Sequence, residues 1–213
     1  MSFLSSSCSF TRFQVKDPVA SEFWPTVPDK LKQFAFHDID DIPEERSYGW
    51  VSFDDLLDTE WSEAQPYKGS YLVFSLRLDT RRIPAGVIKK HLALALKQER
   101  QRIAELNKKF IARERIKEIK EQVILKLRQR FLPVPAEFNV IWAPDKNEIW
   151  FASTQGKMID LFMDYFQQSF ELNLEQITPV TLAEKFLDEE GMRTLETLEA
   201  TQFVVYNGDR DSR

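Results

Sequence analysis

Cysteine, histidine and glycine are scarce in this 213-residue chain, with one, two and six residues of each type. A disulfide needs two cysteines, so Cys8 cannot form one within the chain, and a lone thiol is typical of a reducing compartment. The few glycines form neither a GxxxxGK nor a GxGxxG phosphate-binding loop. No GxSxG elbow or similar pairing of nucleophile and base is present. These absences favour a binding protein over an enzyme, with no cofactor.

Long apolar runs are also missing. No stretch reaches the roughly 18 apolar residues that a membrane-spanning helix needs. The start, MSFLSSSCSF, lacks the basic residues and the apolar length of a signal peptide. We therefore expect a cytoplasmic protein without a membrane partner. With 43% hydrophobic and 13% aromatic residues, the chain can bury a substantial core.

Charge is distributed unevenly along the chain. From Arg81 to Arg130 there are sixteen Lys or Arg and five Glu, a local charge of +11, in a chain with 29 basic and 34 acidic residues. The remainder therefore has 13 basic and 29 acidic residues, or −16. Segregation of this kind is typical of a surface that binds a polyanion. The alternative is a solvated surface with pairs between Glu and Lys along each helix, but five Glu cannot neutralise sixteen cations.

The basic segment has the periodicity of two helices. Apolar residues recur at steps of three and four on one stripe of each half. The stripes are Ile88, Leu92, Leu96, Ile103 and Leu106 in the first half, and Ile116, Ile119, Val123 and Leu127 in the second. Residues 107–110 interrupt the pattern, so we expect a short turn between two helices, with one continuous helix as the alternative. The cations predicted to bind phosphate lie ahead of or beside these stripes: Arg81, Arg82, Lys89, Lys90, Lys97, Arg100, Lys108, Lys109, Arg113, Lys117, Lys120 and Arg128.

The rest of the chain predicts short strands and helices. We expect strands at 3–15, 48–53, 70–78, 138–142, 148–152 and 172–177, with a hairpin turn at 144–147. We expect helices at 22–36, after a cap at Ser153 or Thr154, at 181–190 up to Gly191, and at 192–199. The order is β-α-β-β, two basic helices, β-β-α-β and a small helical end. This order predicts an α+β fold with antiparallel or mixed sheets and four parts: 1–80, 81–132, 133–178 and 179–213.

Two acidic clusters leave a second function open. His37, Asp38, Asp40 and Asp41 form one cluster, and Asp54, Asp55 and Asp58 form the other. Clustered carboxylates can hold divalent cations, so a metal-dependent nuclease is the alternative function. Adjacent acids on a loop are more often simply solvated, so no metal site is expected. A third possibility is a scaffold that only binds other proteins.

Four stretches resemble the RdgC family of recombination-associated proteins. They are SYGWVSFDDLLDTEW, YLVFSLRLDTRRIPAGVIKKHL, KKFIARERIKEIKEQV and LPVPAEFNVIWAPDKNEIWFAST, and the likeness extends over most of residues 1–200. In this family a Gly-Trp pair precedes a strand, a Pro-containing segment opens the basic helix, and a hairpin bearing Trp follows.

The resemblance implies a DNA-binding homodimer without enzymatic activity. Family members form a ring whose basic lumen surrounds duplex DNA, and they restrain RecA-dependent recombination. We therefore expect a nucleoid-associated protein that binds double-stranded DNA without sequence specificity and meets recombination proteins. This chain ends soon after Phe203, where longer members continue, so we expect an abbreviated member, and closure of a complete ring remains open.

Phe110 and Ile111 form an apolar pair in the predicted turn, between Lys109 and Arg113. Such a pair is more often folded back onto its own helices. The alternative is a tip that contacts a second copy of the chain or DNA, since exposed apolar residues mark contacts.

Overall fold

The computed structural model describes residues 3–62, 65–105 and 110–199. The chain divides into two compact units, Met1–Glu175 and Gln176–Arg213. Helices and strands are mixed, and the strands form a seven-stranded sheet. The predicted α+β class is therefore confirmed.

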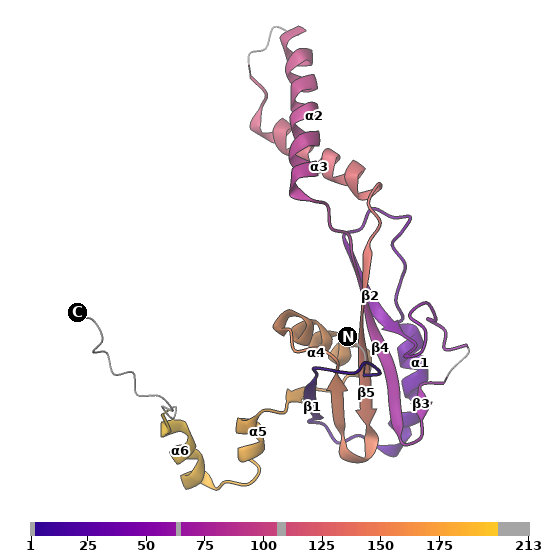
Figure 1. The fold of residues 1–213 in the computed structure, drawn as a ribbon, viewed down its shortest axis with the longest axis vertical. Coiled ribbons are helices and arrows are strands. Elements are labelled where there is room, and N and C mark those ends of the chain that lie inside the picture. The colour runs from indigo at the N-terminus through magenta and orange to yellow at the C-terminus, as the bar shows by residue number, and fades with distance from the viewer. Residues whose placement is uncertain (1–2, 63–64, 106–109, 200–213) are drawn as a thin grey trace, which may run out of the picture. The chain divides into compact units, whose positions relative to one another are not determined.

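The sheet joins strands from both sides of the basic segment (Figure 1). Its order is β2-β4-β5-β6-β1-β7, with β3 beside β4. The pairs β2 with β4, β4 with β5, β5 with β6 and β6 with β1 are antiparallel. The strands are β1 Thr11–Val15, β2 Arg46–Val51, β3 Tyr67–Lys68, β4 Tyr71–Thr80, β5 Val134–Ala143, β6 Glu148–Phe151 and β7 Leu174–Gln176.

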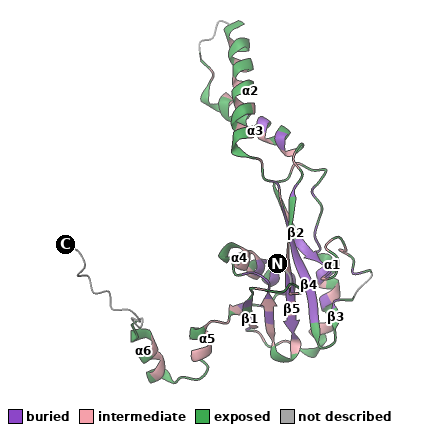
Figure 2. Ribbon diagram, in the orientation of Figure 1, coloured by how far each residue is buried: buried purple, intermediate pink, exposed green. Residues whose placement is uncertain are grey.

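Two helices, α1 (Val27–Gln33) and α4 (Gly156–Phe170), cover one face of the sheet. A short 3-10 helix, η1 (Ser21–Thr26), precedes α1. Phe162, Phe166 and Phe170 recur at steps of four on α4 and are buried. They pack against Trp50 and Trp142 of the sheet with ring centroids 5.1 to 6.2 Å apart. Figure 2 shows that buried residues are concentrated in the strands of the sheet and in α1 and α4, which cover it.

The opposite face of β4 is polar but largely buried. Arg77 donates two hydrogen bonds of 2.8 Å to Asp79, and its guanidinium lies 4.1 Å from the ring centroid of Phe36. The hydrogen bonds to Asp79 raise the pKa of Arg77. Because the charge is paired and bonded, burial is tolerated here.

The basic segment forms two helices inserted between β4 and β5 (Figure 1). They are α2 (Ala85–Glu105) and α3 (Arg113–Arg128). The residues between them include 106–109, which lie outside the described part of the chain. The expectation of two helices rather than one is therefore met.

The second unit contains α5 (Pro179–Ala183) and α6 (Glu189–Thr197). Thr178 and Thr181 cap α5 reciprocally, and Asp188 caps α6 by accepting the N–H of Gly191. Gly191 therefore lies in the first turn of α6 and does not end a helix. This corrects the predicted boundary, because the Asp188 cap begins a helix where the glycine pattern predicted an end.

Four further boundaries differ from the sequence predictions. The opening strand begins only at Thr11, and the predicted helix at 22–36 is split into η1 and α1. The N-cap of α4 is Gln155, whose N–H is accepted by the Ser153 hydroxyl. β5 begins at Val134, ahead of Pro135. Pairing with the long strand β4 extends β5 beyond the residues that its own pattern marks.

Candidate nucleic-acid interface

Most of the predicted apolar stripe residues hold α2 and α3 together, although Ile103 is not part of their buried cluster and Leu106 lies outside the described residues. Ile119, Val123 and Leu127 are buried, and half-buried residues of α2, among them Ile88, Leu92 and Leu96, pack against them. Ile116 is more than one-third exposed and lies outside this cluster. It was wrongly assigned to the stripe, because the buried contact begins one turn later, at Ile119.

The two helices run in opposite directions. Glu99 on α2 bonds Arg115 near the start of α3, at 2.9 Å. Nearer the sheet, His91 on α2 shares a hollow with Leu127, close to the end of α3. Each step forward along α2 is thus matched by a step backward along α3.

Arg81 is not available to bind phosphate. Its side chain is buried at 4% exposure. The guanidinium donates to the backbone oxygens of five residues, at 2.5 to 3.2 Å: Ile39, Asp40, Ile42, Glu44 and Phe131. This corrects the predicted role, because these internal acceptors already use the donors of its fork.

Arg128 is partly occupied as well. It forms an ion pair with Glu45, from the acidic segment before β2. Its side chain is 28% exposed, so a phosphate would have to compete with this carboxylate.

The other described cations of the predicted set are exposed. They are Arg82, Lys89, Lys90, Lys97, Arg100, Arg113, Lys117 and Lys120. None of them makes an ion pair with another residue that the structure describes. Lys108 and Lys109 lie outside the described residues.

Helical geometry places six of these eight cations on one flank of the pair. At about 100° per residue, Lys89, Lys97 and Arg100 lie on one side of the buried stripe of α2. Arg113, Lys117 and Lys120 lie in the same way beside the stripe of α3. In an antiparallel pair these two sides fall on the same face. We call these six residues the DNA-side flank.

The opposite flank also carries cations, which the sequence analysis missed. Hollows between the helices place Arg102 of α2 on the same side as Arg115 and Lys126 of α3. Arg130, which follows α3, lines the adjoining hollow. Lys126 and Arg130 are separated from Val123 by three and seven residues, so the same helical projection could have found them. We call this side the groove flank.

Only part of the charge on the groove flank is neutralised. Arg115 bonds both Glu99 and Glu118 at 2.9 Å. The hydrogen bond from Arg115 lowers the pKa of Glu99, and the pKa of Arg115 is raised in return. This pair fixes the far end of the groove flank and contributes little net charge.

The structure does not bring the acidic clusters together as a metal site. Asp54 pairs with Lys68, and Asp55 and Asp58 accept backbone N–H groups of their own loop. Asp38 accepts the backbone N–H of Asp40 at 2.7 Å. Within residues 3–62, 65–105 and 110–199, no three His, Cys, Asp or Glu side chains are grouped so that they could hold a metal ion.

Phe110 is exposed, with 86% of its surface accessible. It does not fold back onto the described parts of α2 and α3, so the expectation of burial is wrong. With Ile111 it lines an open hollow at the end of the pair, beside Ile103 and Arg102. An apolar side chain in this position is free to contact another molecule.

A protein-family model described as "Putative exonuclease, RdgC" matches residues 9–188. The chain belongs to the RdgC family. The match includes the sheet, the helical pair and α5, so the resemblance found in the sequence is confirmed. Membership of the RdgC family associates the chain with DNA and recombination. No curated protein matches the chain. None of the helices within the described residues is long and apolar enough to cross a bilayer.

Proposed function

We propose that this RdgC-family chain binds double-stranded DNA without sequence specificity, through phosphates held on the DNA-side flank. The observation that carries the proposal is the set of six exposed cations from two packed helices, which lack carboxylate partners among the described residues. Such cations release counterions when they bind phosphates. Phosphate contacts position a protein on DNA but carry no sequence information directly.

The packing of α2 on α3 makes this flank a fixed surface. Apolar residues of α2 and α3 pack against each other, which holds the two helices together. The long cationic side chains of both helices therefore extend from one packed unit. Ala93 and Ala104 lie between the cations on α2 and are exposed. Neither residue has a side-chain group that can hydrogen-bond to base edges, which supports contact chiefly with the backbone of DNA.

We also propose that the protein acts as a homodimer that modulates RecA-type recombination in the nucleoid, without enzymatic activity of its own. One helical pair presents one basic flank, which can face one side of a duplex. A second copy would supply the other side. The exposed Phe110 and the half-buried Ile111 supply an apolar contact that could hold two like-charged ends together.

Binding to two duplexes, one of arbitrary and one of scrambled sequence, tests the proposal. We expect equal affinities, and a loss of about tenfold or more in Lys117→Ala/Lys120→Ala. The matched control is Lys32→Ala/Lys157→Ala, which removes the same charge from exposed positions on α1 and α4. Failure of the intact protein to bind DNA at low salt, or equal losses in both double variants, would refute the proposed surface.

The family description, which names a putative exonuclease, favours a second candidate function, a nuclease. Such an enzyme would act with a divalent metal ion. Asp40 has an exposed side chain, while its backbone oxygen accepts from Arg81, so Asp40→Ala should leave the fold intact. Incubation of linear and circular duplexes with Mg²⁺ or Mn²⁺ distinguishes the two functions. Degradation by the intact protein that disappears in Asp40→Ala would replace the non-enzymatic proposal.

A further inference from the structure

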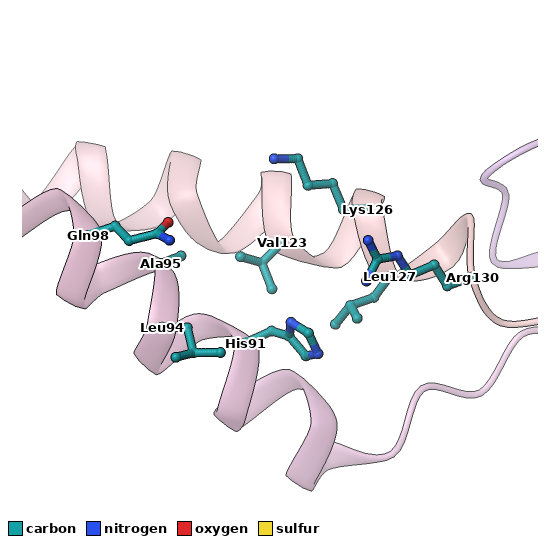
Figure 3. A pocket seen from close by; sticks show the side chains of 8 residues that line it. All are labelled: His91, Leu94, Ala95, Gln98, Val123, Lys126, Leu127 and Arg130. Carbon is teal, nitrogen blue, oxygen red and sulfur yellow. The ribbon is translucent and has the colours of Figure 1, made fainter.

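A groove between α2 and α3 opens on the groove flank, away from the proposed DNA surface. Its cavity has a volume of about 240 Å³. Residues of α2, among them His91, Leu94 and Gln98, line this groove together with Val123, Lys126 and Arg130. Figure 3 shows the His91 side chain pointing toward Leu127 across it. A neighbouring hollow of about 210 Å³ shares Ala95, Gln98, Val123 and Lys126 with it, so the two form one elongated groove.

The main cavity is cationic and lacks compensation. Among the residues that the structure describes, no Asp or Glu side chain lines it. Lys126 and Arg130 are exposed and form no ion pair with any residue that the structure describes. Glu99 lines the neighbouring hollow but not the main cavity, and Arg115 neutralises it. A ligand of this groove should therefore carry negative charge.

The floor of the cavity is apolar. Val123 and Leu127 lie at its base, and Leu94 remains 50% exposed at its edge. A DNA duplex presents phosphates and sugars outward and keeps its bases stacked, so it has no side group to fill such a floor. A peptide has such groups, and burial of their apolar surface favours binding.

We propose that this groove is a docking site for an acidic peptide segment of a partner protein, anchored by one large apolar side chain. Lys126 and Arg130 bind the carboxylates, and the apolar residue inserts between Leu94, Val123 and Leu127. Gln98 offers an amide that can bond the peptide backbone. The main cavity alone, at about 240 Å³, is smaller than the roughly 300 to 1,000 Å³ of pockets that enclose drug-sized ligands, so it suits a single side chain.

The site goes beyond the proposed DNA-binding function and is separable from it. The cations of the groove flank and of the DNA-side flank lie on opposite sides of the helical pair. A partner with an acidic segment could therefore bind while DNA occupies the other flank. Either function can fail in experiment without the other.

Fluorescence anisotropy with defined peptides tests the site on the full chain. The probe is a labelled peptide of sequence Asp-Gly-Asp-Asp-Phe-Asp-Asp-Gly-Asp. Two matched peptides replace Phe by Ala, or every Asp by Asn. We expect saturable binding of the probe and at least tenfold weaker binding of both matched peptides, because the groove needs charge and an apolar anchor together.

Variants locate the binding on one flank. Lys126→Ala/Arg130→Ala should abolish binding of the probe and retain DNA affinity, whereas Lys117→Ala/Lys120→Ala should have the reverse effect. Circular dichroism spectra that match the parent protein exclude misfolding as the cause. Equal binding of the Ala peptide would show simple ion pairing and overturn the proposal. A second result would also overturn the proposal. If the peptide does not bind, but labelled oligo-dT does and loses its binding in Lys126→Ala/Arg130→Ala, the ligand of the groove is single-stranded nucleic acid.

Discussion

Arg81 and Arg82 are neighbours in sequence with opposite environments. Arg81 is buried and bonds five backbone oxygens near the base of the helical pair, whereas Arg82 is exposed. The acceptors come from the segment before β2 and from Phe131 after α3. At this scale, burial decides which cation serves the fold and which remains available to a ligand.

Replacement of Arg81 should destabilise the protein. Arg81→Met keeps the length of the side chain but leaves several buried carbonyl groups without a donor. Since each buried group left unpaired costs about 1 to 3 kcal/mol, we expect the free energy of unfolding in urea to fall by about 3 kcal/mol or more. Arg82→Met is the control and should change it by less than about 0.5 kcal/mol. Similar small effects in both variants would contradict the structural role of Arg81.

Phe110 should matter for association and little for stability. Because the side chain is 86% exposed, we expect Phe110→Ala to change the free energy of unfolding by no more than about 0.5 kcal/mol. Deletion of a core phenylalanine costs about 3 to 5 kcal/mol. Sedimentation equilibrium should show weaker dimerisation in the same variant. A loss of stability in the core range would show that Phe110 is covered in solution.

At the scale of elements, close backbone contact fixes the edge of the sheet. Phe34 and Phe36 exchange backbone hydrogen bonds of 3.0 Å with Trp50 of β2. Gly49 permits this approach, since a Cβ at this position would lie 2.5 Å from the backbone nitrogen of Phe36. The Gly-Trp pair of the sequence thus has a steric reason: glycine admits a neighbouring segment, and Trp50 fills the core.

Two glycine substitutions should have opposite effects. Gly49→Ala forces the segment at Phe36 away from β2, and overpacking of this kind costs about 1 to 3 kcal/mol. Gly86→Ala, in the first turn of α2, meets open space and should stabilise the protein by up to about 1 kcal/mol. Thermal unfolding of both variants measures the difference. A neutral Gly49→Ala would mean that β2 and its neighbour do not approach this closely.

The Glu99–Arg115 pair should make the helical pair sensitive to acid. The hydrogen bond from Arg115 holds the pKa of Glu99 below its ordinary value of 4.5. The stabilisation that the Glu99–Arg115 pair contributes is therefore present above about pH 4.5. It is lost as the pH falls through the lowered pKa of Glu99 in the folded protein. We expect the difference in melting temperature between the parent protein and Glu99→Gln to shrink over this range. A constant difference for Glu99→Gln over this range would exclude the linkage.

At the scale of the molecule, charge is segregated along a chain of net charge −5. The positive segment is confined to the helical insertion between β4 and β5, while the remainder is acidic. Repulsion by the acidic remainder should direct a polyanion to the helices. Attraction of this kind weakens as salt screens the charges.

DNA binding should accordingly depend steeply on salt. If about six phosphates are neutralised, the logarithm of the binding constant falls by about 5 for each tenfold rise in salt. Lys117→Ala/Lys120→Ala should lower this slope by about 2, while the control Lys32→Ala/Lys157→Ala leaves it unchanged. Titrations over a range of KCl concentrations measure these slopes. A shallow slope that is unaffected by the variants would exclude phosphate contacts as the main source of affinity.

The sequence by itself determined the α+β class, the two helices and the stripe from Ile119 to Leu127, because hydrophobic periodicity is a local property. It also located the excess of positive charge. Only the tertiary structure decided which cations are free. Arg81 is bonded by carbonyl groups distant in sequence, Arg128 by Glu45, and Arg115 by Glu99. The groove flank likewise arises only when α2 packs on α3, since neither helix alone has a second wall. Burial and pairing depend on residues that the fold brings together, and no local pattern records those partners.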